Sequence, residues 1–293
     1  MKRTCPRCSN ISENRNLCPR VILFGRYYRS SDRSFVQRFS CLDCKSSFSS
    51  ATTHPCVRQK KRHKNFPISE QFCSGTSGRR TARLLKISRH TVARKLRFLG
   101  LRADERFEKT LNRHVPSKEV EFDEMETFEH SKCKPLSILL AVEKKTRKIL
   151  AFDVCRMPAK GPLADVSRKK YGPRADERPE SRARFLEKLA SLIHPKATVM
   201  SDKNPHYPEL VRKLLPGRIH ETTKGRRGCV VGQGELKRGG FDPLFSLNHT
   251  CAKFRDDISR LARRTWSTTK DPARLRDHIA IYVNYHNKWL LRS

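Results

Sequence analysis

Residues 120–127 read Val-Glu-Phe-Asp-Glu-Met-Glu-Thr, and the rest of the chain is organised around this segment. It predicts a short strand that brings an acid, Asp123, to its end. Two further apolar runs follow closely, at residues 136–142 and 149–154, with Lys-rich turns between them. Three such runs in quick succession predict a three-stranded meander. An acid at a strand end, in a chain that is otherwise strongly basic, indicates a metal site.

The composition points to a polyanionic partner. The 293-residue chain has 64 Lys and Arg against 29 Asp and Glu, for a net charge of +35. This charge exceeds what solubility needs and is spread too widely to be one tail, which favours nucleic acid as the partner. The alternative is a ribosome-associated or generally adhesive basic protein. The length allows two or three domains.

No apolar run predicts a membrane segment, because the longest, residues 136–142, is far short of the ~20 residues that a spanning helix requires. The first residues lack the apolar core of a secretory signal. We therefore expect a cytoplasmic protein without membrane contacts. In that reducing compartment its 11 cysteines are thiols or metal ligands rather than disulfides.

Two Cys-x-x-Cys pairs near the start of the chain predict a structural zinc site. They are Cys5-Pro-Arg-Cys8 and Cys41-Leu-Asp-Cys44, with strand-like patches between them. Four thiolates at this spacing suit one tetrahedral Zn²⁺, and metal binding would supply much of the folding free energy of so small a segment. Residues 1–57 are therefore expected to form a zinc ribbon. The other nearby candidate ligands are interpreted as bystanders: Cys18, His54, Cys56 and His63.

Residues 58–101 predict a DNA-binding domain. A basic linker, residues 58–64, precedes two helices that meet at a short turn within residues 76–100. Ser88 can cap the second helix. The expected packing joins Ala82, Leu85 and Ile87 to Val92, Leu96 and Leu99. The second helix then exposes Arg89, His90, Arg94 and Arg97, as in the recognition helix of a helix-turn-helix, although any small helical hairpin shows similar spacing.

Residues 102–118 are polar and predict a linker, and residues 119–293 a third domain. After the meander we expect a loop at residues 157–179 and a helix at 181–193. A short strand, residues 197–202, then ends in Asp202. A helix at residues 207–215 and a strand at 218–223 complete this part.

This order is that of the ribonuclease-H-like fold, an α/β fold with a mixed sheet and flanking helices. Its first and fourth strands are neighbours, so Asp123 and Asp202 should share one edge. Two carboxylates held close together repel unless a cation lies between them, and hard oxygen ligands suit Mg²⁺ or Mn²⁺. Such a site serves in-line phosphoryl transfer. Each acid considered alone is better interpreted as an ordinary surface residue, and only the two together, at strand ends, favour a metal site.

With these features in order, the chain resembles the bacterial insertion-sequence transposases of the DDE superfamily that carry an N-terminal zinc ribbon and helix-turn-helix. Asp123-Glu124-Met125 is similar to that family's first acidic motif and Ser201-Asp202 to its second. Residues 260–265, Arg-Leu-Ala-Arg-Arg-Thr, followed by Lys270, resemble its C-terminal helix signature. The resemblance covers nearly the whole chain and implies a DNA transposase.

The third acid of that family is a departure, because its expected position falls on Asn248. Leu247, Cys251, Phe254, Ile258 and Leu261 form the expected buried stripe of a helix, and Asn248 flanks this stripe. An Asn carbonyl oxygen can ligate Mg²⁺ but brings no charge. Asp257 ranks second and Asp256 third as the third ligand. A further alternative is that this ligand has been lost.

The remaining segments receive simpler interpretations. Residues 224–240, which include Glu235, predict a mobile basic loop, and Trp266 is either a base-stacking or a core residue. Asp271 is expected to cap a last helix, residues 272–287, whose Leu275, Ile279, Val283 and Trp289 should pack against the fold.

The sequence thus predicts a transposase that binds the terminal inverted repeats of its element as double-stranded DNA and acts as a homo-oligomer. The competing class is a DNA-binding regulator derived from such an enzyme.

Overall fold

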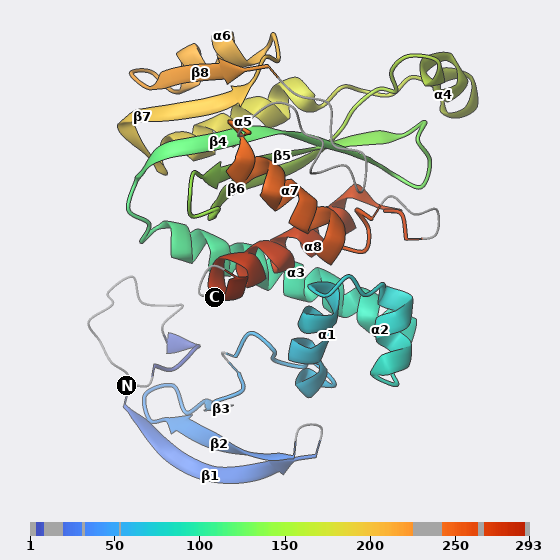
Figure 1. The fold of residues 1–293 in the computed structure, drawn as a ribbon. Coiled ribbons are helices and arrows are strands. Elements are labelled where there is room, and N and C mark those ends of the chain that lie inside the picture. The colour runs from blue at the N-terminus through green and yellow to red at the C-terminus, as the bar shows by residue number, and fades with distance from the viewer. Residues whose placement is uncertain are drawn as a thin grey trace. The chain divides into compact units, whose positions relative to one another are not determined.

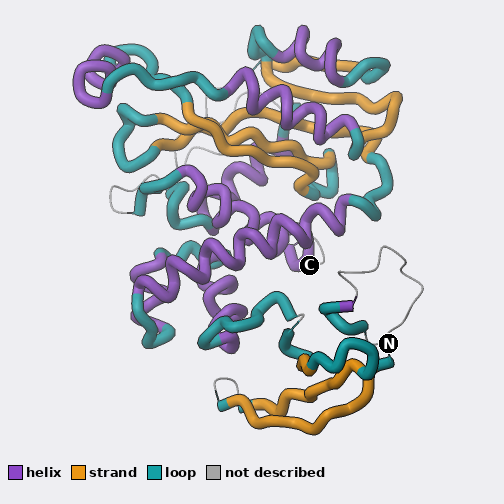
Figure 2. Tube along the Cα trace, turned by 180° about the vertical axis from the view of Figure 1, so that it is seen from behind, coloured by secondary structure: helices purple, strands orange, loops and turns teal. Residues whose placement is uncertain are grey.

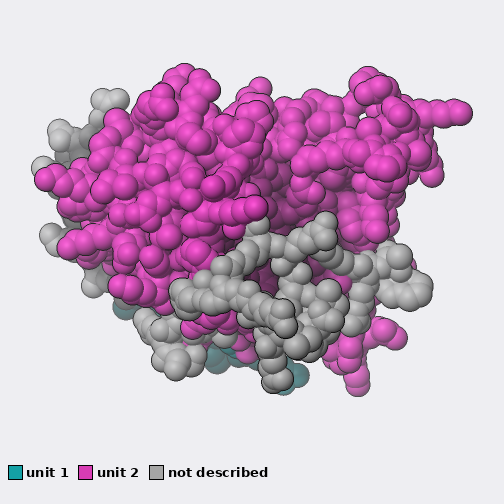
Figure 3. Space-filling view, turned by 45° about the horizontal axis from the view of Figure 1, so that its top comes forward, with its two compact units in different colours: residues 1–67 teal, residues 68–293 magenta. Residues whose placement is uncertain are grey.

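The computed structural model describes residues 4–8, 20–30, 33–52, 54–224, 242–262 and 267–290. The chain divides into two compact units, Met1–Pro67 and Ile68–Ser293, coloured separately in Figure 3. Within the described residues, no helix combines the length and the apolar character that a membrane span requires.

The first unit contains a small antiparallel sheet. Its strands are β1 (Val21–Arg29), β2 (Ser34–Cys41) and β3 (Ser47–Ser49), in that order across the sheet, and a 3-10 turn, η2 (Arg62–Lys64), follows. The buried apolar side chains that are described in this unit are Val36, Phe39, Cys5 and Cys41. Because two of these four are cysteines, the sheet has little hydrophobic core of its own.

A five-stranded mixed sheet forms the centre of the second unit. Its strands are β4 (Ser117–Phe128), β5 (Pro135–Glu143), β6 (Ile149–Arg156), β7 (Ile193–Asp202) and β8 (Ile219–Thr223). They lie in the order β6-β5-β4-β7-β8, and β4, β5 and β6 form the expected antiparallel meander. β7 pairs in parallel with β4 and with β8. This arrangement is consistent with a ribonuclease-H-like fold.

Helices cover both faces of this sheet (Figures 1 and 2). On one face lie α5 (Arg178–Ala190) and α6 (Tyr207–Leu214), where Phe185 and Tyr207 contact the ring of Phe122 in β4. On the other face, α7 (Phe245–Asp257) contacts β4 and β5, and α8 (Pro272–Tyr285) contacts β6. A π-helical turn, η4 (His286–Leu290), follows α8. The strand residues of β4 therefore alternate between two helical layers.

Three helices precede the sheet: α1 (Asn65–Phe72), α2 (Gly78–Leu84) and α3 (Arg89–Leu111). Ser88 caps α3 as predicted, accepting the N–H of Thr91 at 3.1 Å. The predicted packing of α2 on α3 is also present, with Ala82, Val92 and Leu96 buried. α3 lies against α8, and Gly100 permits the close approach, since a Cβ there would lie 2.7 Å from the Cα of Asp277.

Several boundaries differ from the expectations. Residues 102–118 are not a linker, because α3 continues to Leu111, and α2 and α3 belong to the same compact unit as the large sheet. The expected loop at residues 157–179 contains α4 (Leu163–Tyr171), and α5 begins before residue 181. α7 ends at Asp257, because the backbone of Ile258 is extended. The predicted loop at 224–240 lies outside the described residues after residue 224. Residues 263–265 of the C-terminal signature and Trp266 also lie outside them.

The last helix agrees with its prediction except at its end. Asp271 caps α8 by accepting the N–H of Ala273 at 2.9 Å. Leu275, Ile279 and Val283 are fully buried. Trp289 does not pack against the fold: 52% of its surface is exposed.

Candidate functional site

Asp123 and Asp202 lie level with each other on neighbouring strands. The last paired residues of β4 and β7 are Glu121 and Met200, and each aspartate follows two residues later. Because side chains alternate along a strand, both aspartates project from the face of the sheet that carries Glu121 and Met200. The parallel pairing thus brings the two predicted acids to one place.

The electrostatics of this pair suit a cation. Burial and the negative charge of Asp202 raise the pKa of Asp123 to about 7, although the N–H of Glu124 and the hydroxyl of Tyr207 act against this rise. Within the described part of the chain, neither aspartate forms an ion pair with Lys or Arg. The donor set is two carboxylates, the hard oxygen ligands that Mg²⁺ and Mn²⁺ prefer. These residues therefore fit a divalent metal.

Glu124, the next residue of β4, belongs to a separate buried network on the opposite face. Its Oε1 accepts the Nε–H of Arg182 at 2.5 Å, and its Oε2 accepts the hydroxyl of Ser137 at 2.7 Å. Both partners of the ion pair are almost inaccessible, with 6% of the Arg182 side chain and 11% of the Glu124 side chain exposed. Glu124 is thus neutralised by Arg182 and is not available as a metal ligand. Its role is structural.

The start of α7 is fixed to the face of β4 that carries Asp123. Glu121, which is buried, accepts the N–H of Leu247 through Oε2 at 2.8 Å. One turn further along, burial raises the pKa of Cys251, and the negative charge of Asp123 adds to this rise. At about 100° per residue, Asn248 stands about 60° from Cys251 around the helix. Asn248 itself is exposed on the first turn of the helix.

The two other candidates for the third ligand lie at the opposite end of α7. Asp257 accepts the hydroxyl of Tyr282 at 2.6 Å and forms an ion pair with Lys253 at 3.2 Å. Asp256 is 79% exposed beside the same lysine. Asn248 and Asp257 are nine residues apart, which is about 13 Å along a helix. The structure thus gives Asp257 a stabilising role in the contact with α8.

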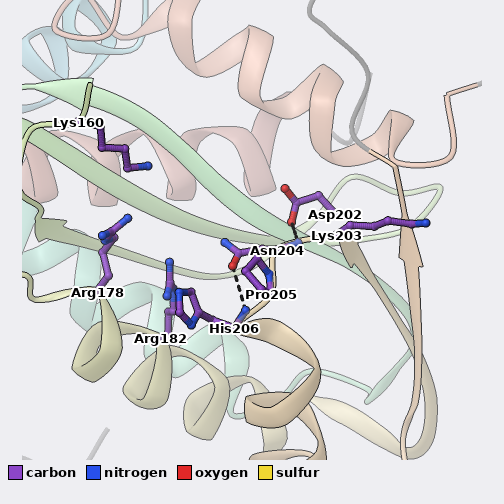
Figure 4. Close-up of a pocket in the computed structure, with 8 residues that line it drawn as sticks. All are labelled: Lys160, Arg178, Arg182, Asp202, Lys203, Asn204, Pro205 and His206. Atoms are coloured by element: carbon purple, nitrogen blue, oxygen red, sulfur yellow. Dashed lines mark hydrogen bonds between the residues drawn. The ribbon is translucent and has the colours of Figure 1, made fainter. Parts of the chain in front are cut away.

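An open pocket of about 390 Å³ adjoins Asp202. Figure 4 shows Lys160, Arg178 and Arg182 pointing into it from the side opposite Asp202, while Lys203 points away. Each of these three cations has a carboxylate partner: Glu126 for Lys160, Asp176 for Arg178 and Glu124 for Arg182. The pocket is therefore polar and electrostatically balanced.

The four predicted zinc ligands come together in the first unit. The sulfur atoms of Cys5, Cys8, Cys41 and Cys44 all lie within 4.8 Å of one another. The Cys5–Cys44 and Cys8–Cys41 distances are 3.6 and 3.7 Å, close to the ~3.8 Å that tetrahedral Zn²⁺ with 2.3 Å bonds imposes. Hydrogen bonds from the Ser46 side chain and backbone lower the pKa of Cys44 to about 6, which favours its thiolate. The cluster is compatible with structural zinc.

The predicted DNA-contacting residues form one exposed surface at the start of α3. Arg89, His90, Arg94 and Arg97 are all exposed. Within the described residues, none of the three arginines has a carboxylate partner. Their charges are therefore available to a polyanion.

Sequence reasoning missed three residues of the acidic site: Tyr207, Glu121 and Asp242. Tyr207 donates to Asp123, Glu121 holds α7, and Asp242 accepts the side-chain N–H of Asn248 at 2.8 Å. Asp242 had a recognisable signal, because an Asp shortly before a helical pattern commonly caps it. The other two contacts join residues that are far apart in the chain.

The comparisons with known proteins add little. No protein-family model matches the chain, and no curated protein matches it. Among solved structures, a chain in the crystal structure of the Mos1 strand transfer complex is similar at 11% identity, covering 72% of each chain, with a TM-score of 0.25. A TM-score this low supports no conclusion about this chain's fold or function.

Proposed function

We propose that this chain is a DNA transposase of the bacterial insertion-sequence type, with a ribonuclease-H-like catalytic unit that cuts and joins DNA strands at Asp123, Asp202 and Asn248. The observation that carries the proposal is the parallel register that places Asp123 level with Asp202. The first turn of α7 lies on the same face. Two half-buried carboxylates without a Lys or Arg partner among the described residues would form a site for Mg²⁺ or Mn²⁺.

The chain's own residues have distinct roles in this proposal. Asp123 and Asp202 would hold the metal, and the amide oxygen of Asn248 would complete the set. Bound there, a divalent metal would activate a water or a 3′-hydroxyl and stabilise the leaving oxygen of an in-line phosphoryl transfer. Tyr207 keeps the Asp123 carboxylate oriented through its hydroxyl, at 3.2 Å. Glu121 keeps α7 against β4.

DNA recognition is assigned to the parts of the chain before the sheet. α2 and α3 would form a helix-turn-helix whose Arg89, His90, Arg94 and Arg97 contact the terminal inverted repeats. The cysteine cluster would hold one Zn²⁺ in a zinc ribbon. A homo-oligomer would pair two element ends. The net charge of +35 supports a double-stranded DNA partner.

The chemistry is tested with a labelled duplex that carries the DNA flanking the coding sequence. We expect strand cleavage and transfer with Mg²⁺ or Mn²⁺, and their loss in Asp123→Asn and Asp202→Asn while duplex binding is retained. Asp256→Asn, which removes an exposed carboxylate elsewhere on α7, is the matched control. If the wild-type chain binds these ends without cutting them in the presence of either metal, the result would instead support the alternative function, a DNA-binding regulator derived from a transposase.

The recognition surface is tested separately by binding. Arg94→Ala should weaken binding to the same duplex by ~1–3 kcal/mol and relax the sequence preference at one position if Arg94 reads a base. Arg106→Ala is the control, because Arg106 is exposed further along the same helix. An equal loss on every sequence would limit Arg94 to a phosphate contact.

A further inference from the structure

We infer that Asp242 is a positioning residue that orients the amide of Asn248 toward the metal and supplies the negative charge that an amide ligand lacks. The inference rests on the proposed site of Asp123, Asp202 and Asn248. It explains how an uncharged residue can serve at a position where a carboxylate is expected.

Hydrogen bonds hold Asp242 at the entrance to α7. Its Oδ2 accepts the Nδ2–H of Asn248 at 2.8 Å, and its Oδ1 accepts the N–H of Leu244 at 3.0 Å. Its carbonyl oxygen accepts the N–H of Phe245 at 3.1 Å. Both carboxylate oxygens are thus engaged, one with the backbone that begins the helix and one with the side chain on its first turn.

This contact determines which atom Asn248 offers to a cation. An ionised carboxylate only accepts hydrogen bonds, so the amide nitrogen must face Asp242, and the reverse orientation would set two oxygens against each other. Within the described part of the chain, no hydrogen bond engages Oδ1 of Asn248. The amide is therefore held with its metal-binding oxygen unoccupied by other protein groups.

The same contact strengthens that oxygen as a ligand. A carboxylate that accepts a hydrogen bond from a metal ligand fixes the ligand's orientation and raises its basicity, as in the carboxylate–histidine–zinc arrangement. Here the carboxylate draws the amide N–H, so electron density shifts toward Oδ1. Asp242 thereby adds a negative charge close to the site, separated from the metal by the Asn248 side chain.

Glu121 fixes the backbone of the same turn independently. Its hydrogen bond to the N–H of Leu247 attaches the residue before Asn248 to the strand that carries Asp123. The start of α7 is thus bound to β4 through its backbone, and the Asn248 side chain is then oriented by Asp242. Carboxylates at a helix N-terminus are also favoured by the helix dipole.

The test measures Mn²⁺ binding to the full-length, zinc-loaded chain by electron paramagnetic resonance, without DNA. Asp242→Asn should weaken Mn²⁺ binding about tenfold, whereas Asp256→Asn should leave it unchanged. Asn248→Asp in the wild-type background sets two carboxylates against each other and should also bind Mn²⁺ more weakly than wild type. Asn248→Asp combined with Asp242→Asn exchanges amide and carboxylate, and should recover the loss.

The recovery distinguishes positioning from a merely structural role, because a lost helix cap is not restored by a change at Asn248. Wild-type affinity in Asp242→Asn, or a double variant no better than Asp242→Asn alone, would overturn the inference while leaving the proposed site intact. If Asp123→Asn and Asn248→Ala also keep wild-type Mn²⁺ affinity, the proposed site and the inference both fail.

Discussion

The hydroxyl of Tyr207 lies 3.2 Å from Oδ1 of Asp123 and 3.3 Å from Oε1 of Glu124, so one donor serves two adjacent carboxylates of β4. The two acids project to opposite faces of the sheet. The pairing of β4 with β7 ends at Glu121, so the β7 side of β4 is open next to these acids. Tyr207 is 1% exposed and reaches both across that edge. It therefore connects the acidic pair to the buried Glu124–Arg182 network.

Removing this hydroxyl should impair metal binding. Tyr207→Phe takes away a hydrogen bond that lowers the pKa of Asp123, so the pKa should rise further above about 7. More of the carboxylate is then protonated at neutral pH, and the pH of half-maximal Mn²⁺ binding should move upward. Tyr171→Phe, a phenol remote from the acids, is the control. An unchanged pH midpoint in Tyr207→Phe would show that the hydroxyl does not influence Asp123.

The metal-free chain should become less stable as the pH rises through the range in which Asp123 ionises. Its folded-state pKa of about 7 exceeds the ordinary aspartate value of 3.8, so the folded state binds more protons than the unfolded state between these values. The stability contributed by the protonated form is complete below the unfolded pKa and is lost as the pH rises through the folded pKa. Urea unfolding of Mg²⁺-free protein at about pH 5 and about pH 8 measures this change.

Asp123→Asn should remove most of that pH dependence, and Mg²⁺ should stabilise the wild type most at the higher pH. The metal competes with the proton for the same carboxylate, so its binding should also release protons near neutral pH. If the free energy of unfolding of the wild type changed with pH in the same way as that of Asp123→Asn, the raised pKa of Asp123 would be contradicted.

The strand order and the acidic pair were predictable because their signals are local. Apolar runs marked β4, β5 and β6, and Asp202 closes β7 as predicted. Asp123 does not end its strand, because β4 continues to Phe128 in its pairing with β5. The extension of α3 beyond residue 101 also had a local signal. Ala103, Phe107 and Leu111 recur every four residues and are buried, but the polar residues between them suggested a linker.

The supporting contacts were not predictable because they depend on tertiary geometry. Tyr207 and Asp123 are 84 residues apart in the chain, and nothing in either segment identifies the other. Glu121 is a charged residue within a strand, yet it is buried under the start of α7. The pairing of Asp257 with Tyr282 likewise depends on where α8 crosses α7.

Zinc should be required for the first unit and not for the second. Because that unit has little apolar core, Cys41→Ser should lose the bound metal, about one Zn²⁺ per chain, and unfold residues 1–67. Proteolysis should then leave a protected fragment that begins near residue 68. Cys73→Ser removes a thiol outside the cluster and should keep the zinc. Protein prepared without chelator that carries no zinc by metal analysis would exclude the ribbon.

Asp257 and Asp123 should respond in opposite ways to the same chemical change. Asp257 accepts the hydroxyl of Tyr282 at 2.6 Å, and its backbone oxygen accepts the N–H of Gly75 at 2.7 Å. Asp257→Asn weakens a charge-assisted hydrogen bond, so it should lower the free energy of unfolding by ~1–3 kcal/mol. It should leave Mn²⁺ affinity and strand cleavage unchanged.

Asp123→Asn should leave the free energy of unfolding unchanged or raise it, because it removes the repulsion between Asp123 and Asp202. It should abolish Mn²⁺ binding and strand cleavage, because it removes a metal ligand. Chemical unfolding and Mn²⁺ titration of both variants, with Asp256→Asn as the exposed control, decide between the two roles. If Asp257→Asn loses Mn²⁺ and cleavage at wild-type stability while Asn248→Ala retains both, Asp257 is the third ligand and α7 must rotate to bring it there.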